Sequence, residues 1–215
     1  MSEIRWVNRY LGGTAAILEP LKTFCRSLST SHVLTILDLG TASADIPCAI
    51  ANWLRQSERH FSLTAVDLHP TAVQEAQRYV AAYPEITVLQ KDALQLIDWN
   101  VSYDFVISSM FLHHLNNHDA VHLLKTMAKL ARKGFIINDL ERHPLAWLGI
   151  RCLGWLTLKG KIFRYDSALS VKRAFTRDEL KFLCHQAGLP EAQIHHRFPF
   201  RWVIIWQRPS DAASY

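Results

Sequence analysis

The sequence predicts an α/β fold in which a mostly parallel sheet of seven strands carries helices on both faces. Short apolar runs rich in β-branched residues alternate with stretches of helical periodicity. Runs of this kind, without polar alternation, are typical of strands buried on both faces of a parallel sheet. Polar or acidic residues follow several of the runs, at the sheet edge where α/β proteins bind ligands. The strands are expected at 33–37, 61–67, 86–90, 103–109, 134–138, 192–196 and 201–207.

Length and composition fit one globular domain. The chain has 215 residues, of which 49% are hydrophobic, so it can bury a sizeable core. No repeat or linker divides it, and we expect a single domain over 1–215. The start lacks the apolar run of a signal peptide, and the cysteines are scattered without a CxxC pair, which predicts a cytoplasmic protein with reduced thiols. The cysteines are Cys25, Cys48, Cys152 and Cys184.

The chain is moderately basic, with a net charge of +5 and a pI near 9.1. Basic residues become denser between 159 and 177. This stretch is either a solvated face or an attraction for an anionic substrate, a carrier protein or a membrane surface. Because no block of lysine and arginine stands out, nucleic acid is not the favoured partner.

Helices are predicted between the strands, at 45–55, 71–82, 118–131 and 176–188. Residues 4–28 also have helical periodicity, which Gly12, Gly13 and Pro20 should divide into short pieces. Segment 145–158 is the most apolar of the chain, but it is too short to span a bilayer. It either packs on the domain, lines a lipophilic pocket or makes a weak contact with a membrane surface.

The first predicted strand runs into a turn of small residues, Asp38-Leu39-Gly40-Thr41-Ala42-Ser43-Ala44, and a helix then starts at Asp45. A turn of this kind brings backbone N–H groups up to a nucleotide-like ligand. The turn resembles the first motif of class I S-adenosylmethionine (SAM) dependent methyltransferases, D/E-x-G-x-G-x-G, with alanine in place of the second and third glycine. We expect a positive φ at only one position, since an alanine there would be disfavoured by roughly 1 kcal/mol.

Two further acidic residues follow later strands. Asp67 ends the second predicted strand, where a carboxylate can accept two hydrogen bonds from a ribose. NAD-binding domains share this device, whereas Asp92-Ala93 after the third strand resembles the methyltransferase position that meets adenine. The resemblance therefore implies SAM as cofactor and S-adenosylhomocysteine (SAH) as product. Its implied cofactor-binding residues are Asp38, Gly40, Thr41, Ala42, Asp45, Asp67, Leu68, Asp92, Ala93 and Ser108.

The resemblance covers essentially the whole chain and is nearest to quinone-biosynthesis and aromatic polyketide O-methyltransferases. It implies a Rossmann-like sheet whose final strand is antiparallel, a helical lid over 1–30, and a helical substrate-recognition insertion over 139–175. The implied substrate contacts are Asn8, Arg9, Arg142, Trp147 and Arg151.

Methylation of a hydroxyl requires a base, and neutral imidazole is suited to that role near pH 7. The candidates are His114, His143 and His113, with Asp139 as a possible acid–base or orienting partner. The helical pair His118 and His122 lacks a carboxylate or cysteine at matching spacing, so no metal is expected.

We expect methyl transfer to a small, largely hydrophobic acceptor that is phenolic, polyketide or quinol-like, by O-methylation. C-methylation of a quinone precursor, RNA methylation and SAM binding without transfer stay open as alternatives. The segment 108–111 reads Ser-Ser-Met-Phe where amino-methylating nucleic-acid enzymes usually carry N/D-P-P-Y/F, which disfavours nucleobase amines. Both a monomer and a homodimer are compatible with the sequence.

Overall fold

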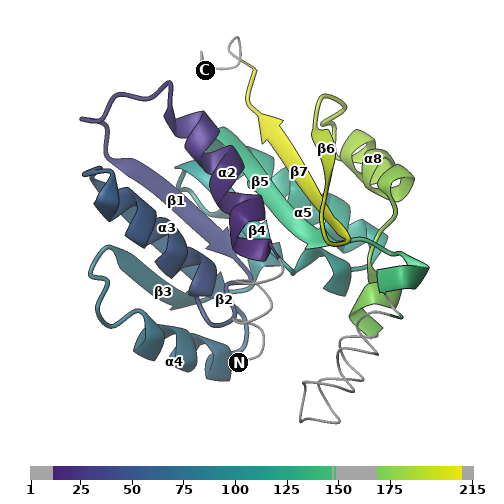
Figure 1. Cartoon of the computed structure of the whole chain (residues 1–215), viewed down its shortest axis with the longest axis horizontal. Helices are drawn as coiled ribbons and strands as arrows, with labels where there is room; N and C mark the ends of the chain where they lie inside the picture. The colour runs from purple at the N-terminus through teal and green to yellow at the C-terminus, as the bar shows by residue number, and fades with distance from the viewer. Residues whose placement is uncertain (1–11, 147, 149–168, 210–215) are drawn as a thin grey trace.

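A computed structural model describes residues 12–146, 148 and 169–209, and its centre is a seven-stranded sheet (Figure 1). The strand order is β3-β2-β1-β4-β5-β7-β6, which confirms the predicted sheet. The first five strands are parallel, and β7 is antiparallel to both of its neighbours, β5 and β6. The strands are β1 (Leu34–Leu39), β2 (Phe61–Asp67), β3 (Ile86–Gln90), β4 (Tyr103–Ser109), β5 (Ala131–Leu140), β6 (Gln193–Arg197) and β7 (Arg201–Gln207).

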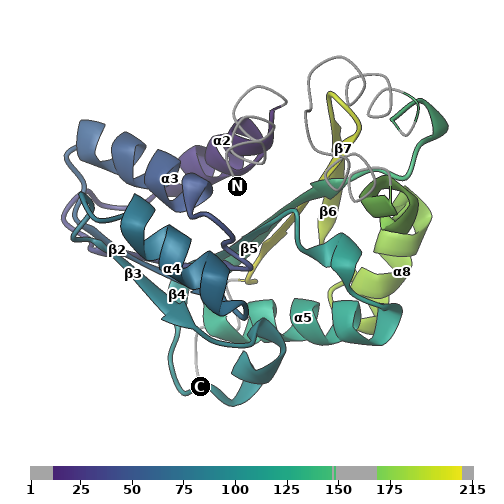
Figure 2. The same cartoon turned by 90° about the horizontal axis from the view of Figure 1, so that it is seen from below.

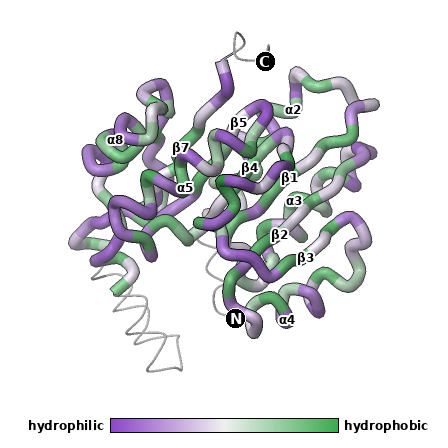
Figure 3. Tube along the Cα trace, turned by 180° about the vertical axis from the view of Figure 1, so that it is seen from behind, coloured by the Kyte–Doolittle hydropathy of each residue, from purple (hydrophilic) through white to green (hydrophobic). Residues whose placement is uncertain are grey.

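Helices cover both faces of this sheet, as predicted (Figure 2). One face packs against α2 (Gly13–Cys25), α3 (Asp45–Gln56) and α4 (Pro70–Tyr79). The other face packs against the 3-10 helix η1 (Ala93–Asp98), α5 (Asn117–Leu130) and α8 (Arg177–Gln186). Two hydrophobic cores result, one on each side, and hydrophobic stretches run along the central strands between them (Figure 3).

Two local predictions were wrong. Pro20 lies inside the continuous helix α2 and does not divide it, and Gly13 is the first residue of that helix. Pro20 is buried against the sheet, so tertiary packing offsets the backbone hydrogen bond that proline cannot make. Strand β5 also extends beyond the predicted 134–138 at both ends, because it pairs with β4 on one side and β7 on the other.

Candidate functional site

The turn after β1 contains three residues in the left-handed region: Gly40 (φ 73°), Ala42 (φ 48°) and Ala44 (φ 57°). The expectation of a single positive φ was therefore wrong. An L-residue held in this region costs on the order of 1 kcal/mol, so surrounding hydrogen bonds must fix the two alanines. Gly40 N and Thr41 N both donate to Val66 O at 3.0 Å, which ties the turn to the end of β2.

Asp67 closes the same turn from β2. Its Oδ2 accepts from Ala42 N at 2.9 Å, and its Oδ1 accepts from His69 N at 2.9 Å. Because a carboxylate has about four acceptor positions, Asp67 keeps lone pairs for a ligand after making both bonds. The residue predicted to hold a ribose is thus also the residue that shapes the turn.

Three polar residues occupy equivalent positions in the strand register, at the carboxyl edge of the parallel strands. Ser109 and Asn138 are paired neighbours on β4 and β5, and Asp67 lies at the same level on β2 by the pairing register. Side chains alternate along a strand, and Ala65, Ile107 and Ile136 all belong to the core on the α2–α3–α4 side. Asp67, Ser109 and Asn138, each two residues further along, therefore face that same side.

Asp38 lies two residues deeper on β1, again on that side, and is only 2% exposed. Burial raises the pKa of its carboxyl to about 7. Thr41 Oγ1 is buried nearby and forms no hydrogen bond of regular geometry among the described residues, but its closeness to the Asp38 carboxyl opposes part of that rise in pKa. A carboxyl that ionises near neutral pH and a buried hydroxyl beside it fit the cationic, hydrogen-bonding amino-acid end of SAM.

The raised pKa predicts a pH-dependent difference between the wild-type protein and Asp38→Asn. The unfolded aspartate ionises near pH 3.8 and the folded one near 7, so folding loses stability as the pH rises between these values. Without ligand, Asp38→Asn should be the more stable protein at pH 8, and the advantage should shrink toward pH 4. Urea unfolding at several pH values measures this, with the exposed Asp98→Asn as control; a variant less stable at pH 8 would contradict it.

The other predicted cofactor residues differ in their placement. Asp92 caps η1 through Leu94 N at 2.9 Å, and Ala93 is buried in the core beside it. Leu68 is 53% exposed, next to Asp67 at the same edge. Asp45 begins α3 and accepts from Ser43 Oγ at 3.3 Å.

The structure does not support the prediction that Ser108 binds the cofactor. It is fully buried, and its hydroxyl donates to Leu39 O at 2.9 Å. This bond joins β4 to β1, so the side chain stabilises the sheet. Its neighbour Ser109 is the serine on the face of Asp67, a choice the sequence could not make because β4 is apolar on both sides.

A second polar group lies on the opposite face of β5. Asp139, 3% exposed, accepts from His113 N at 3.0 Å and lies 2.5 Å from His113 Nδ1. Burial alone would raise the pKa of Asp139, but His113 and the Leu140 N–H hold it below its ordinary value. His113 is itself buried, so this pair fixes the segment after β4 against the end of β5. Both residues were predicted to be catalytic, and their geometry suits a positioning role.

His114 follows on the same short 3-10 helix and is exposed. Its ring lies 4.1 Å from the His113 ring, centre to centre. Partial burial of the His114 ring removes water that would stabilise its charged form, which lowers the pKa of His114. The neighbouring His113 lowers this pKa further. The segment also lies against the turn after β1, since a Cβ added to Gly40 would lie 2.7 Å from the Phe111 ring.

His143 is held by a different contact. Its Nδ1 accepts from Leu145 N at 3.2 Å, and its ring stacks on Phe200 with centres 5.0 Å apart. An accepting Nδ1 puts the proton of the neutral ring on Nε2. The nitrogen left to face a substrate is then a donor, which is the wrong tautomer for a base.

The substrate contacts predicted at Asn8, Arg9, Trp147 and Arg151 lie outside the described residues, as do 1–11 of the predicted lid and 149–168 of the predicted insertion. Arg142 is described, and it is bound at 2.5 Å to Glu179 at the start of α8. This ion pair directs it to α8, away from the row of polar side chains at the strand ends.

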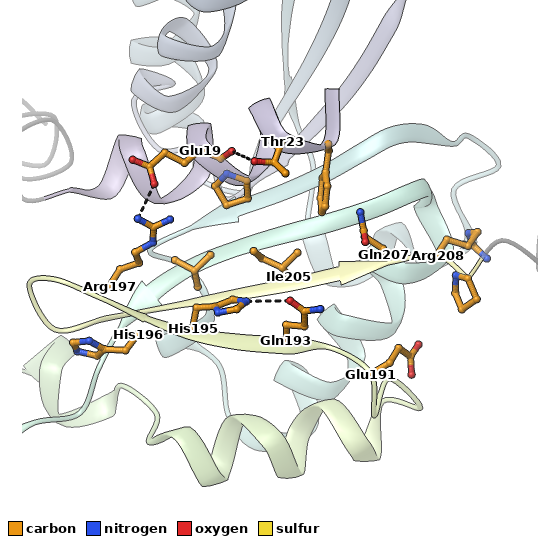
Figure 4. Close-up of a pocket in the computed structure, with 14 residues that line it drawn as sticks. Glu19, Thr23, Glu191, Gln193, His195, His196, Arg197, Ile205, Gln207 and Arg208 are labelled. Carbon is orange, nitrogen blue, oxygen red and sulfur yellow. Dashed lines mark hydrogen bonds and ion pairs between the residues drawn. The ribbon is translucent and has the colours of Figure 1, made fainter. Parts of the chain in front are cut away.

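A separate groove of about 1010 Å³ lies between α2 and the β6–β7 pair (Figure 4). Arg197 and Glu19 meet across it at 2.6 Å, and His195 contacts Gln193 at 3.2 Å. It contains none of the predicted site residues.

Within the described part of the chain, no cluster of His, Cys, Asp or Glu is arranged to hold a metal ion. No helix in that part has the length and apolar character needed to cross a membrane.

The candidate site residues predicted from the sequence did not include Ser109, Asn138 or Arg201. Arg201 begins β7, is 2% exposed and donates to Met110 Sδ at 3.1 Å. Burial lowers its pKa to about 10, and the charge of Asp139 partly opposes that shift. The approach of β7 to β5 creates this contact, and no local pattern marks it.

Known proteins share both the motif region and the fold. A family model described as a methyltransferase domain matches residues 36–134, and comparison with curated proteins found no match. The plantazolicin methyltransferase BpumL in complex with SAH superposes with a TM-score of 0.69 at 14% identity, over 94% of this chain and 88% of that chain. Magnesium protoporphyrin IX methyltransferase (ChlM) from Synechocystis PCC 6803 with bound SAH gives 0.62 at 18% identity, over 93% and 84%. The citrinin polyketide synthase CMeT domain gives 0.65 at 12% identity, over 86% and 49%.

Proposed function

We propose that the chain is a SAM-dependent methyltransferase that methylates a hydroxyl group of a small, largely hydrophobic acceptor of phenolic, polyketide or quinol-like chemistry. When bound, SAM supplies a methyl group that is already activated on a sulfonium, so the protein's main task is to align the acceptor.

One observation carries this proposal: the turn of Gly40, Ala42 and Ala44 closed by Asp67. Asp67 would hold the ribose and Asp92 the adenine, while Asp38 and Thr41 would hold the amino-acid end. The buried Thr41 Oγ1 beside Asp38 supports this, because a buried polar atom without a hydrogen bond of good geometry is stabilised when a ligand or water completes it.

His114 is the base that the geometry favours. It is exposed at the carboxyl edge, and its lowered pKa keeps the ring neutral near pH 7. The buried His113–Asp139 pair beneath it would keep its backbone in place. His114 would take up the acceptor's hydroxyl proton while the acceptor oxygen receives the methyl group that SAM would supply, and the products would be a neutral ether, an imidazolium and SAH, whose sulfur keeps the electrons of the broken S–CH3 bond.

Exposed apolar side chains near this edge support a hydrophobic acceptor. Leu145 is 60% exposed, Leu148 52%, and Phe198, at the β6–β7 turn, 87%. Glu141 N donates to Phe200 O at 2.9 Å, so the β6–β7 turn lies against the segment that leads from β5 to Leu145. The structural neighbours are themselves named as a magnesium protoporphyrin IX methyltransferase, a plantazolicin methyltransferase and the CMeT domain of a polyketide synthase.

The test is transfer from methyl-labelled SAM to a panel of phenols, quinols and polyketide aglycones, with mass spectrometry to locate the label. The expected product carries the label as a methyl ether. Label on ring carbon would point to C-methylation, and label on added RNA at high salt would point to a nucleic-acid substrate. SAM binding without transfer to any panel member or to extracted small molecules would overturn the proposal.

A further inference from the structure

Asn138, at the carboxyl end of β5, is completely buried, yet one atom of its amide has no partner. Its Nδ2 donates to Ser109 Oγ at 2.9 Å, and its main-chain oxygen accepts from Met110 N at 2.8 Å. Its Oδ1 is unsatisfied among the described residues. A buried amide oxygen normally accepts at least one hydrogen bond, so this atom needs a donor that the described protein does not provide.

The polar residue next to Asn138 does not compete for such a donor. Asp139 faces the opposite side of the sheet, where His113 and the Leu140 N–H occupy its carboxylate. The unused acceptor at this end of β5 is therefore Asn138 Oδ1, on the same side as Asp67 and Ser109.

The strand order places Asn138 beyond the residues assigned to the cofactor. Along the sheet the order is β2, β1, β4, β5, so Asn138 is three strands from Asp67, a distance of roughly 14 Å at the usual strand spacing. Asn138 is two strands from Asp38. If the ribose lies at Asp67 and the amino-acid end at Asp38, the cofactor ends before it reaches Asn138. With the cofactor placed in this way, this part of the edge is left for the acceptor.

We propose that Asn138 Oδ1 accepts a hydrogen bond from a hydroxyl group of the acceptor, which makes Asn138 a specificity-determining residue. The inference rests on the proposed function and adds a requirement to it: the acceptor must carry a hydrogen-bond donor at this point. Ser109 holds the amide nitrogen, which leaves the amide oxygen as the atom that can accept from the acceptor. A site built for a hydroxyl rejects an analogue that lacks it, because the buried oxygen is then left unpaired.

The experiment measures binding of 2-naphthol and its methyl ether, 2-methoxynaphthalene, to the full chain saturated with SAH. The wild-type protein should prefer 2-naphthol about tenfold, the effect of one hydrogen bond to a buried acceptor. Asn138→Leu has a similar shape without polar atoms and should lose the preference. Asn138→Asp keeps an acceptor oxygen and should retain it, which separates hydrogen bonding from packing.

Each other outcome has a distinct meaning. A tenfold loss of SAH affinity in Asn138→Leu would assign Asn138 to the cofactor's ammonium group and overturn the proposal. Equal binding of both probes by the wild-type protein, binding of neither, or preference for the ether would overturn it as well. So would a fall in melting temperature in Asn138→Leu with the preference kept, the result expected for a structural water. Failure of the wild-type protein to bind SAH at all would instead refute the proposed function.

Discussion

Replacing His114 by alanine should lower kcat by about 10²–10⁴-fold while SAM affinity stays unchanged, because a positioned base contributes on that order. His114 is exposed at the carboxyl edge and lies on the segment whose Phe111 ring touches Gly40. The measurement is steady-state transfer to the acceptor found by labelling, with SAM binding followed by calorimetry. His118→Ala is the matched control, since that side chain is 90% exposed and pairs only with Asp119 in the described chain.

The pH profile gives a second readout for His114. Its pKa is lowered, so kcat/KM should stay flat through pH 7 and fall only below the ordinary histidine value of about 6.5. The variant should lack this acid limb. If His114→Ala keeps its activity and His143→Ala loses it, the base has been assigned to the wrong histidine.

Replacing Asp67 by alanine should weaken SAM binding by at least tenfold. The change removes two hydrogen bonds from the ribose to a charged acceptor, each worth about 1.5–3 kcal/mol. It also removes the bond from Ala42 N at 2.9 Å, which holds one of the strained alanines in the turn. Calorimetry measures the affinity, and circular dichroism tests whether the fold is intact.

Two variants separate the roles of Asp67. Asp67→Asn retains one oxygen for Ala42 N, so it should keep the turn but still bind SAM more weakly than the wild-type protein. Asp98→Ala removes a carboxylate that is 92% exposed and should change neither property. Unchanged affinity in Asp67→Ala would remove the basis for placing the ribose at the end of β2.

Local patterns determined the elements of this fold. The apolar runs identified each strand, and the polar residues that follow them identified Asp38, Asp67 and Asp92 at one edge, because the strands of a parallel sheet end on the same side. The capping box at Thr176 and Glu179 likewise predicted the start of α8. These features depend on neighbours along the chain, so a single sequence contains them.

The chemistry of the site depended on contacts between residues far apart in the sequence. Asp67 accepts a hydrogen bond from Ala42 N and so holds the turn after β1 in place. This turn has three left-handed residues, whereas one was expected. Asp139 binds His113 from the next strand, which leaves His114 as the exposed histidine of that segment. Alternation alone could not separate Ser108 from Ser109 in a strand that is apolar on both sides.

The sequence by itself determined the class of fold, and it predicted the cofactor and the edge of the sheet at which we propose that the cofactor binds. Only the tertiary structure decided how those residues are used. Burial sets the pKa of Asp38 near 7, encloses Thr41 Oγ1 beside it, and leaves Asn138 Oδ1 without a partner among the described residues. Strand identity is encoded by the alternation and composition of adjacent residues, whereas burial and hydrogen-bond completion arise only when distant segments pack together.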